Sequence, residues 1–110
     1  MRTPKQLLDD IISQIVAIEN FLASSQIPLE QDIQLQYANI IIGEATKNLP
    51  SDMLSQYEHE WKAIKGFRDY LVHNYHQIYA ERIQEALEKL PALRSTIEKM
   101  LADVTKKDTE

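Results

Sequence analysis

The fold class is decided by residues 7–22, which read LLDDIISQIVAIENFL. The apolar residues recur every three or four positions, the spacing that places side chains on one face of an α-helix. Just before them, Thr3 can cap the helix, Pro4 suits its first position, and Gln6 completes a capping box. We therefore expect an amphipathic helix that begins near the N-terminus and runs to about Ser24.

A second helix is predicted over residues 29–48, between the breaks around Pro28 and Pro50. Gly43 lies inside this helix, where glycine costs about 1 kcal/mol relative to alanine, so we expect a neighbouring helix to approach closely there. Ile42 widens the apolar face of the helix. The positions assigned to this face are Ile33, Tyr37, Ile40, Ile41 and Ala45.

Helical periodicity continues through the rest of the chain. We predict a short turn capped by Ser51 or Asp52, followed by a helix over residues 61–73. A last helical segment is expected over residues 79–102, and Pro91 should kink or divide it.

No strand pattern and no internal repeat occurs, so the sequence predicts an all-α fold, an antiparallel bundle of about four to five helices. Residues 1–103 are assigned to one helical domain and the polar residues 104–110 to a C-terminal tail. A chain of 110 residues buries only roughly 60–70% of its unfolded surface. We therefore expect its apolar helix faces to be shared with a second copy in a homodimer.

Composition excludes several classes of protein. The sequence contains no cysteine, so neither a disulfide framework nor a Cys-ligated metal site is available. No segment approaches the ~18 apolar residues that a membrane span requires, and the N-terminus has no apolar leader, so we expect a cytoplasmic protein without membrane contact. The formal net charge of -5 argues against coating nucleic acid by electrostatics alone, so any nucleic-acid site must be local.

Candidate chemistry gathers in the helix over residues 61–73, where Arg68 lies in a stripe of apolar and aromatic side chains. Arginine supplies a permanent planar cation for a phosphate, and His73 supplies a proton-transfer group that works near neutral pH. Such a pair suits RNA cleavage, because the ribose 2′-hydroxyl is the nucleophile and no metal or other cofactor is needed. Lys62 and Lys65 are candidates to contact RNA phosphates.

The spacing of this pair raises a geometric problem. His73 follows Arg68 by five positions, and five steps along a straight helix rotate the side chain by about 140°. Two solutions remain open. Either the helix ends or distorts near His73, which Asn74 permits, or working pairs assemble across a two-fold axis between subunits.

Residues 68–75, which read RDYLVHNY, match a known pattern. An arginine, a histidine five positions later, a polar residue directly after it and then a tyrosine resemble the signature of HEPN-superfamily ribonucleases, specifically the HepT-like toxins. The matching residues are Arg68, His73, Asn74 and Tyr75. The resemblance extends upstream to IGEA at residues 42–45 and to WKAIKGF at residues 61–67, and so covers nearly the whole chain.

This resemblance implies a HEPN-like homodimer of helical bundles whose arginine and histidine pairs face a shared cleft and cleave RNA without a metal. It also implies a partner, a minimal nucleotidyltransferase antitoxin of the MntA type, which silences the toxin by attaching adenylate to the motif tyrosine, here Tyr75. Added phosphate at that position would occupy the anion site and obstruct RNA. The residues expected to support the catalytic pair are Asn74, Glu44 and Asp69.

Structural roles remain open for the same charged residues. Arg68 could form an ion pair with Glu44 at a helix interface, which requires no catalysis. Asp69 could pair with Lys65 or Lys62 instead of Arg68.

The histidines and the function as a whole also have alternatives. His76 follows His73 by three positions, but no third ligand is placed, so no metal site is predicted. The alternative function is a non-catalytic helical module that docks onto the nucleotidyltransferase and keeps only the scaffold.

Overall fold

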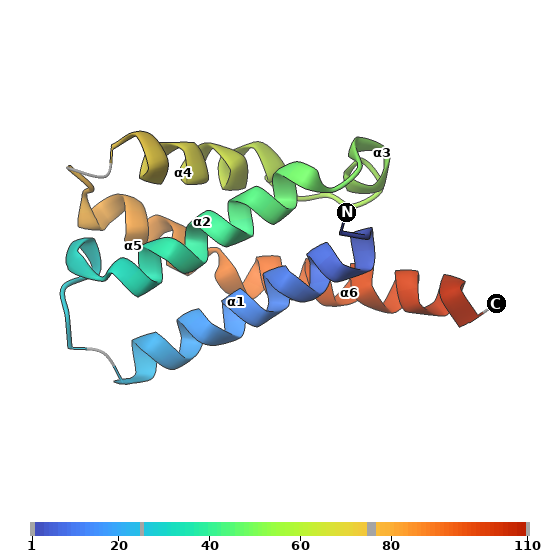
Figure 1. Ribbon diagram of the computed structural model, residues 1–110, viewed down its shortest axis with the longest axis horizontal. Coiled ribbons are helices and arrows are strands. Elements are labelled where there is room, and N and C mark those ends of the chain that lie inside the picture. Colours follow the sequence, from blue (N-terminus) through green and yellow to red (C-terminus); the bar gives the residue numbers. More distant parts are fainter. Residues whose placement is uncertain (1, 25, 75–76, 110) are drawn as a thin grey trace.

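A computed structural model describes residues 2–24, 26–74 and 77–109, and every regular element among them is helical. Figure 1 shows the helices running roughly alongside one another in a bundle. In chain order the elements are α1 (Pro4–Ser24), the 3-10 helix η1 (Leu29–Gln31), α2 (Ile33–Asn48), α3 (Ser51–Leu54), α4 (Trp61–His73), α5 (Ala80–Glu88) and α6 (Leu90–Thr109). The all-α bundle expected from the sequence is confirmed.

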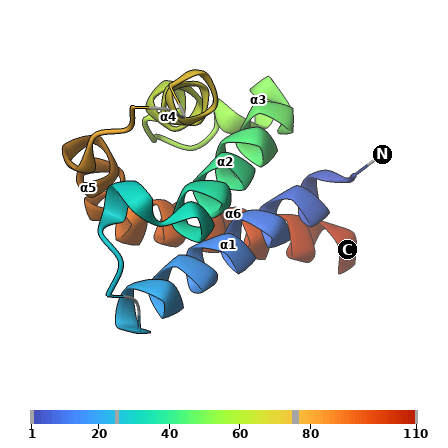
Figure 2. The same cartoon turned by 60° about the vertical axis from the view of Figure 1, so that its left-hand side comes forward.

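Helix α2 occupies the middle of the bundle. It packs against α1 on one side and against α4 on the other, and α6 packs against α1. Figure 2 shows α4 and α1 on opposite sides of α2, and α5 packs against η1 and α6. The largest fully buried side chains come from all these layers: Leu8, Ile11, Ile15, Ile18, Leu35, Leu71, Ile83, Ile97 and Met100.

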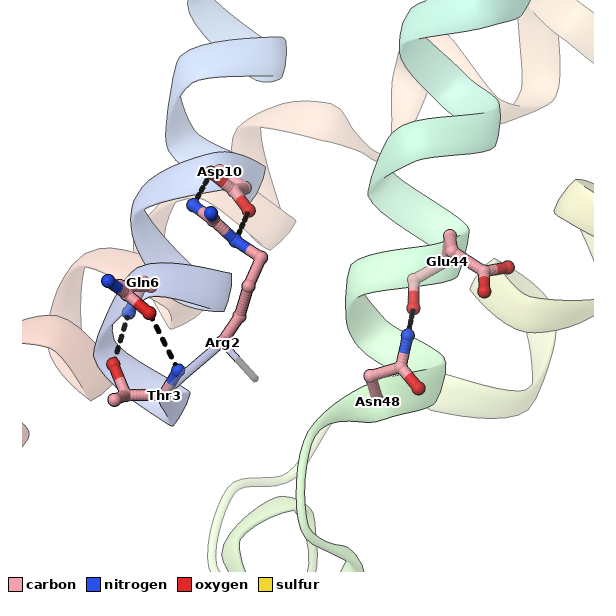
Figure 3. Close-up of polar contacts among 6 residues, drawn as sticks. All are labelled: Arg2, Thr3, Gln6, Asp10, Glu44 and Asn48. Atoms are coloured by element: carbon pink, nitrogen blue, oxygen red, sulfur yellow. Dashed lines mark hydrogen bonds and ion pairs between the residues drawn. The ribbon is translucent and has the colours of Figure 1, made fainter.

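The capping box at the start of α1 is confirmed. The Thr3 backbone N–H donates to Gln6 Oε1 at 2.8 Å, and the Gln6 N–H donates to Thr3 Oγ1 at 3.2 Å (Figure 3). These bonds satisfy two of the backbone groups that a helix start leaves without partners. The helix then runs to Ser24, as its periodicity predicts.

The apolar face assigned to α2 is wrong for its first two turns. Ile33 and Tyr37 are 77% and 64% exposed, whereas the core side of the helix carries Leu35, Ala38, Ile42 and Ala45. Both sets have helical spacing, so α2 has apolar residues on two sides and periodicity alone does not say which side is buried. The outward set leaves an apolar strip on the surface of this chain.

The ends of several helices also differ from expectation. The residue before α3 is Pro50, with no side-chain capping bond, so neither Ser51 nor Asp52 acts as the cap. Pro91 lies in the first turn of α6 and the chain divides at Lys89, as predicted. Helix α6 continues to Thr109, through most of the segment expected as a polar tail.

A short long-range hydrogen bond is among those that tie the segment after α3 to α6. The Tyr57 hydroxyl donates to Asp103 Oδ2 at 2.6 Å. Ionisation of the phenol would lose this bond and set two negative charges together, which raises the pKa of Tyr57 to about 12. The bond holds the connection that leads into α4, the helix with the candidate catalytic residues.

Candidate functional site

Arg68 lies where α4 crosses closest to α2. A Cβ atom built on Gly43 of α2 would overlap the Arg68 Cβ and lie 2.8 Å from its Cγ. Glycine is therefore required at this crossing, and the close approach predicted for Gly43 is confirmed. The stem of Arg68 is packed against the α2 backbone, so only 22% of its side chain is exposed.

Two carboxylates hold the Arg68 guanidinium. Its Nη2 lies 2.9 Å from Glu44 Oε2 on α2, and its Nη1 lies 2.9 Å from Asp69 Oδ1 on α4. Figure 3 shows the Glu44 side chain leaving α2 on the side away from α1. The buried Nε has no hydrogen-bond partner among the described residues. The guanidinium is thus fixed in place at the surface, and part of its donor capacity is unused.

The partner of Asp69 corrects the sequence interpretation. Asp69 pairs with Arg68, and neither Lys62 nor Lys65 forms an ion pair with it among the described residues. The hydrogen bond from Arg68 lowers the pKa of Asp69, and the positive charges of Lys47 and His73 lower it further. Asp69 therefore lies in a positive field that Arg68, Lys47 and His73 create together.

His73 is the last residue of α4, which stays helical up to that point. The helix ends there because Asn74 leaves the helical conformation, with φ of −123° and ψ of 30°. The Asn74 backbone N–H makes the last helical bond to the Tyr70 carbonyl at 3.0 Å, and its Nδ2 donates to the same carbonyl at 3.0 Å. His73 follows Asp69 by four positions, so the two share a face of α4. Asp69 binds Arg68 and lies one helical turn before the exposed His73.

A row of polar residues runs along this outer face of α4. Lys62, Lys65, Asp69 and His73 are spaced by three or four positions. Lys62 and His73 are exposed, and Lys65 is half-buried. The sequence predictions at Tyr75 and His76 fall outside the described residues.

Sequence reasoning missed two residues at this site. Lys47 comes from α2, and nothing in its own sequence neighbourhood indicates that it contributes to the field at Asp69. Tyr70 is an aromatic residue of α4, and its hydroxyl accepts a hydrogen bond from the Tyr79 backbone N–H at 2.9 Å. The guanidinium carbon of Arg82 lies over the Tyr70 ring, 4.3 Å from the ring centroid. Tyr70 therefore ties the start of α5 to the end of α4.

Two negative findings concern the described part of the chain. No group of at least three histidine, cysteine, aspartate or glutamate residues there is arranged to hold a metal ion. None of the helices described combines the length and the apolar character that crossing a membrane requires.

Comparison with known proteins identifies relatives along the whole chain. Residues 8–100 match the family described as Ribonuclease HepT-like. A protein of Thermococcus cleftensis named "Probable ribonuclease HepT" is 33% identical over 90% of this chain and 96% of its own length. A Methanocaldococcus jannaschii protein with a provisional RNase name is 32% identical over 96% of this chain and 97% of its own length. No solved structure gives a significant match.

Proposed function

Because the chain belongs to the Ribonuclease HepT-like family, we propose that it is a metal-independent endoribonuclease whose catalytic residues are Arg68 and His73. The observation that carries the proposal is the charge arrangement on α4. Arg68, a fixed and partly exposed guanidinium, binds Asp69, and the exposed His73 follows one helical turn later on the same face as Asp69. Cleavage of RNA through its own 2′-hydroxyl requires at least a cation that binds the phosphate and a nearby group that transfers a proton.

The proposed mechanism divides the work between the two side chains. His73 takes the proton of the ribose 2′-hydroxyl, the oxygen attacks the adjacent phosphorus, and the bond to the leaving 5′-oxygen breaks as that oxygen gains a proton. Arg68 donates to the phosphoryl oxygens, where negative charge develops. A phosphate that binds Arg68 competes with the carboxylates of Glu44 and Asp69 for the guanidinium. The same carboxylates orient the guanidinium before the phosphate arrives, so less entropy is lost when the phosphate binds.

The proposed homodimer uses the outward apolar strip of α2. Ile33 and Tyr37 are exposed, Ile40 is half-buried, and Glu44 continues the same helix face toward Arg68. An apolar strip of this kind marks a protein contact in a chain that has only a small core. With the two-fold axis near the Glu44 end of this strip, the two Glu44–Arg68 pairs would lie next to each other and the two sites would share a groove.

Placing a charge in this strip should dissociate the proposed dimer. For Tyr37→Glu we expect a change from dimer to monomer in analytical ultracentrifugation and a large loss of RNA cleavage, because a carboxylate would be buried without a partner. The far-ultraviolet circular dichroism should not change, since Tyr37 is already 64% exposed in the single chain. Glu98→Gln on α6 is the control, and we expect it to remain dimeric and to cleave RNA like the wild type. A wild type that is monomeric and still cleaves RNA would contradict the dimer proposal.

We extend the proposal to regulation. The family resemblance suggests that the chain acts as the toxin of a toxin–antitoxin pair and that a nucleotidyltransferase attaches adenylate to Tyr75. Mass spectrometry after incubation with ATP and the partner enzyme should find adenylate on the wild type and none on Tyr75→Phe. Adenylate that persists on Tyr75→Phe would refute the assignment of the tyrosine.

The decisive test of activity removes the proposed general base. Purified wild type, incubated with RNA in the presence of a chelator, should cleave it, and His73→Ala should be slower by about 10²–10⁴-fold. His59→Ala removes a histidine from the segment before α4, ten positions ahead of Asp69, and should cleave like the wild type. If the wild type does not cleave RNA, or if His73→Ala cleaves normally, the catalytic proposal fails and the non-catalytic module is favoured.

A further inference from the structure

A cavity of about 360 Å³ lies between α4 and the elements packed beside it. Its lining comes from α2, α4, α5, α6 and the segment before α4, and Asn39, Ile42, Gly66, Phe67 and Arg82 are among the residues that form it. Gly66 precedes Arg68 by two positions, and two helical steps rotate the side-chain direction by about 200°. The cavity therefore lies on another side of α4 from Arg68, whereas His73, seven positions after Gly66, shares the Gly66 face of the helix.

Gly66 has no reason within the fold to be glycine. Its φ is not positive, and a Cβ atom built there would meet no atom of the described residues within 4 Å. Inside a helix, glycine costs about 1 kcal/mol relative to alanine. Gly43 offsets this cost by allowing α2 and α4 to approach each other, but Gly66 has no such compensation. A ligand that lies flat against the bare backbone would supply the missing reason.

The polar groups of the cavity show what such a ligand would carry. The inner part holds Asn39, which is only 7% exposed and whose Nδ2 donates to the Leu35 carbonyl at 2.9 Å. Its Oδ1 is left to accept a hydrogen bond from a ligand. Nearer the solvent, Arg82 has no ion-pair partner among the described residues and rests on the Tyr70 ring. Its charge is therefore free to bind an anion.

The remaining lining is largely apolar and holds one ion pair and one further carboxylate. The Phe67 ring stacks on the Tyr70 ring with centroids 6.1 Å apart and forms one wall. Lys89 pairs with Glu60 at 3.2 Å, whereas Glu85 has no ion-pair partner among the described residues and can accept a hydrogen bond from a ligand. Burial lowers the pKa of His59. Apolar walls, the cation of Arg82 and two hydrogen-bond acceptors, Asn39 and Glu85, together define the ligand chemistry.

We propose that this cavity binds a small flat aromatic molecule that carries one anionic group, with its ring against Gly66 and Phe67 and its anion on the Arg82 guanidinium. A nitrogen or oxygen donor on the ring reaches Asn39. The volume suits a molecule of two or three rings. Both an aryl acid and a nucleoside monophosphate have this chemistry, and the experiment separates them.

Anilinonaphthalenesulfonate is a suitable first probe, because it is flat, anionic and has an N–H donor. Its fluorescence should rise saturably with one equivalent bound per chain. Arg82→Gln removes a charge-assisted hydrogen bond and should weaken binding by about tenfold or more. Gly66→Leu fills the cavity without meeting a neighbour at Cβ, so the chain should fold normally and lose most of the binding. Arg2→Gln and Ala102→Leu are the matched controls, and both should bind like the wild type.

Competition then identifies the source of the ligand. Displacement of the probe by adenosine monophosphate supports a nucleotide ligand, and displacement by indole-3-acetate supports an aryl acid. The proposal is overturned if neither displaces the probe, or if Gly66→Leu, shown by circular dichroism and cooperative unfolding to be folded, binds it as tightly as the wild type. Binding is measured without RNA, so the result is independent of the proposed ribonuclease activity.

Discussion

Arg68→Lys should lower the rate of RNA cleavage by about 10²–10³-fold although the positive charge is kept. Lysine is a point charge with a flexible stem, whereas the guanidinium of Arg68 donates from Nη1 and Nη2 in fixed directions to Asp69 and Glu44. A lysine at this position cannot satisfy both carboxylates with that geometry while it also binds a phosphoryl oxygen. The loss should appear in kcat, measured on a defined RNA oligonucleotide, because the arginine acts on charge that develops in the transition state.

The matched control for this change is Arg94→Lys. Arg94 pairs with Glu19 at 2.6 Å on the far side of the bundle, so its replacement should leave kcat within about twofold of the wild type. Normal kcat in Arg68→Lys would mean that a simple positive charge is sufficient. The proposed role of the planar fork in stabilising the transition state would then be wrong.

The same substitution at the two glycines should change stability in opposite directions. Gly43→Ala places a Cβ on top of the Arg68 Cβ, which is attached rigidly to the α4 backbone, so we expect a loss of about 1–3 kcal/mol in the free energy of unfolding. Gly66→Ala meets no neighbour and improves helix propensity, so we expect a gain of up to about 1 kcal/mol. Urea titration followed by circular dichroism measures both changes.

The rate of RNA cleavage provides a second measurement for the two glycine variants. Gly43→Ala must push α4 away from α2 and therefore move Arg68 relative to Glu44, so its cleavage rate should fall along with its stability. Gly66→Ala should cleave RNA at the wild-type rate. Equal stabilities for the two variants would show that α2 and α4 adjust freely and that the close helix crossing is not required.

Local signals in the sequence were sufficient to predict the ends of the first and fourth helices. The reciprocal bonds of Thr3 and Gln6 start α1, and Asn74 closes α4, as the sequence suggests for each position. Both depend on residues a few positions apart, and the physics of helix caps is local. The C-terminal end of α6 was not predicted, because the polar residues after 103 include no glycine or proline to stop the helix.

Tertiary information was needed for the rest. Two apolar stripes on α2 have equally good spacing, and only packing against α1 and α4 shows that Leu35 is buried and Ile33 is exposed. The partner of Asp69 depends on how far the Arg68 side chain reaches, and Lys47 joins the site from another helix. The chemical types of Arg68 and His73 identified the candidate pair, but the ion pair between Arg68 and Asp69 could not be predicted from spacing alone.

The central position of α2 affects how this protein could be engineered. The helix carries core residues, the crossing at Gly43 and the outward strip that leads to Glu44. A substitution on its core side or at Gly43, made to silence the protein, therefore risks unfolding it. Changes along the exposed edge of α4, at Lys62 or His73, disturb less packing. An inactive but intact chain, useful for capturing partners, is best obtained there.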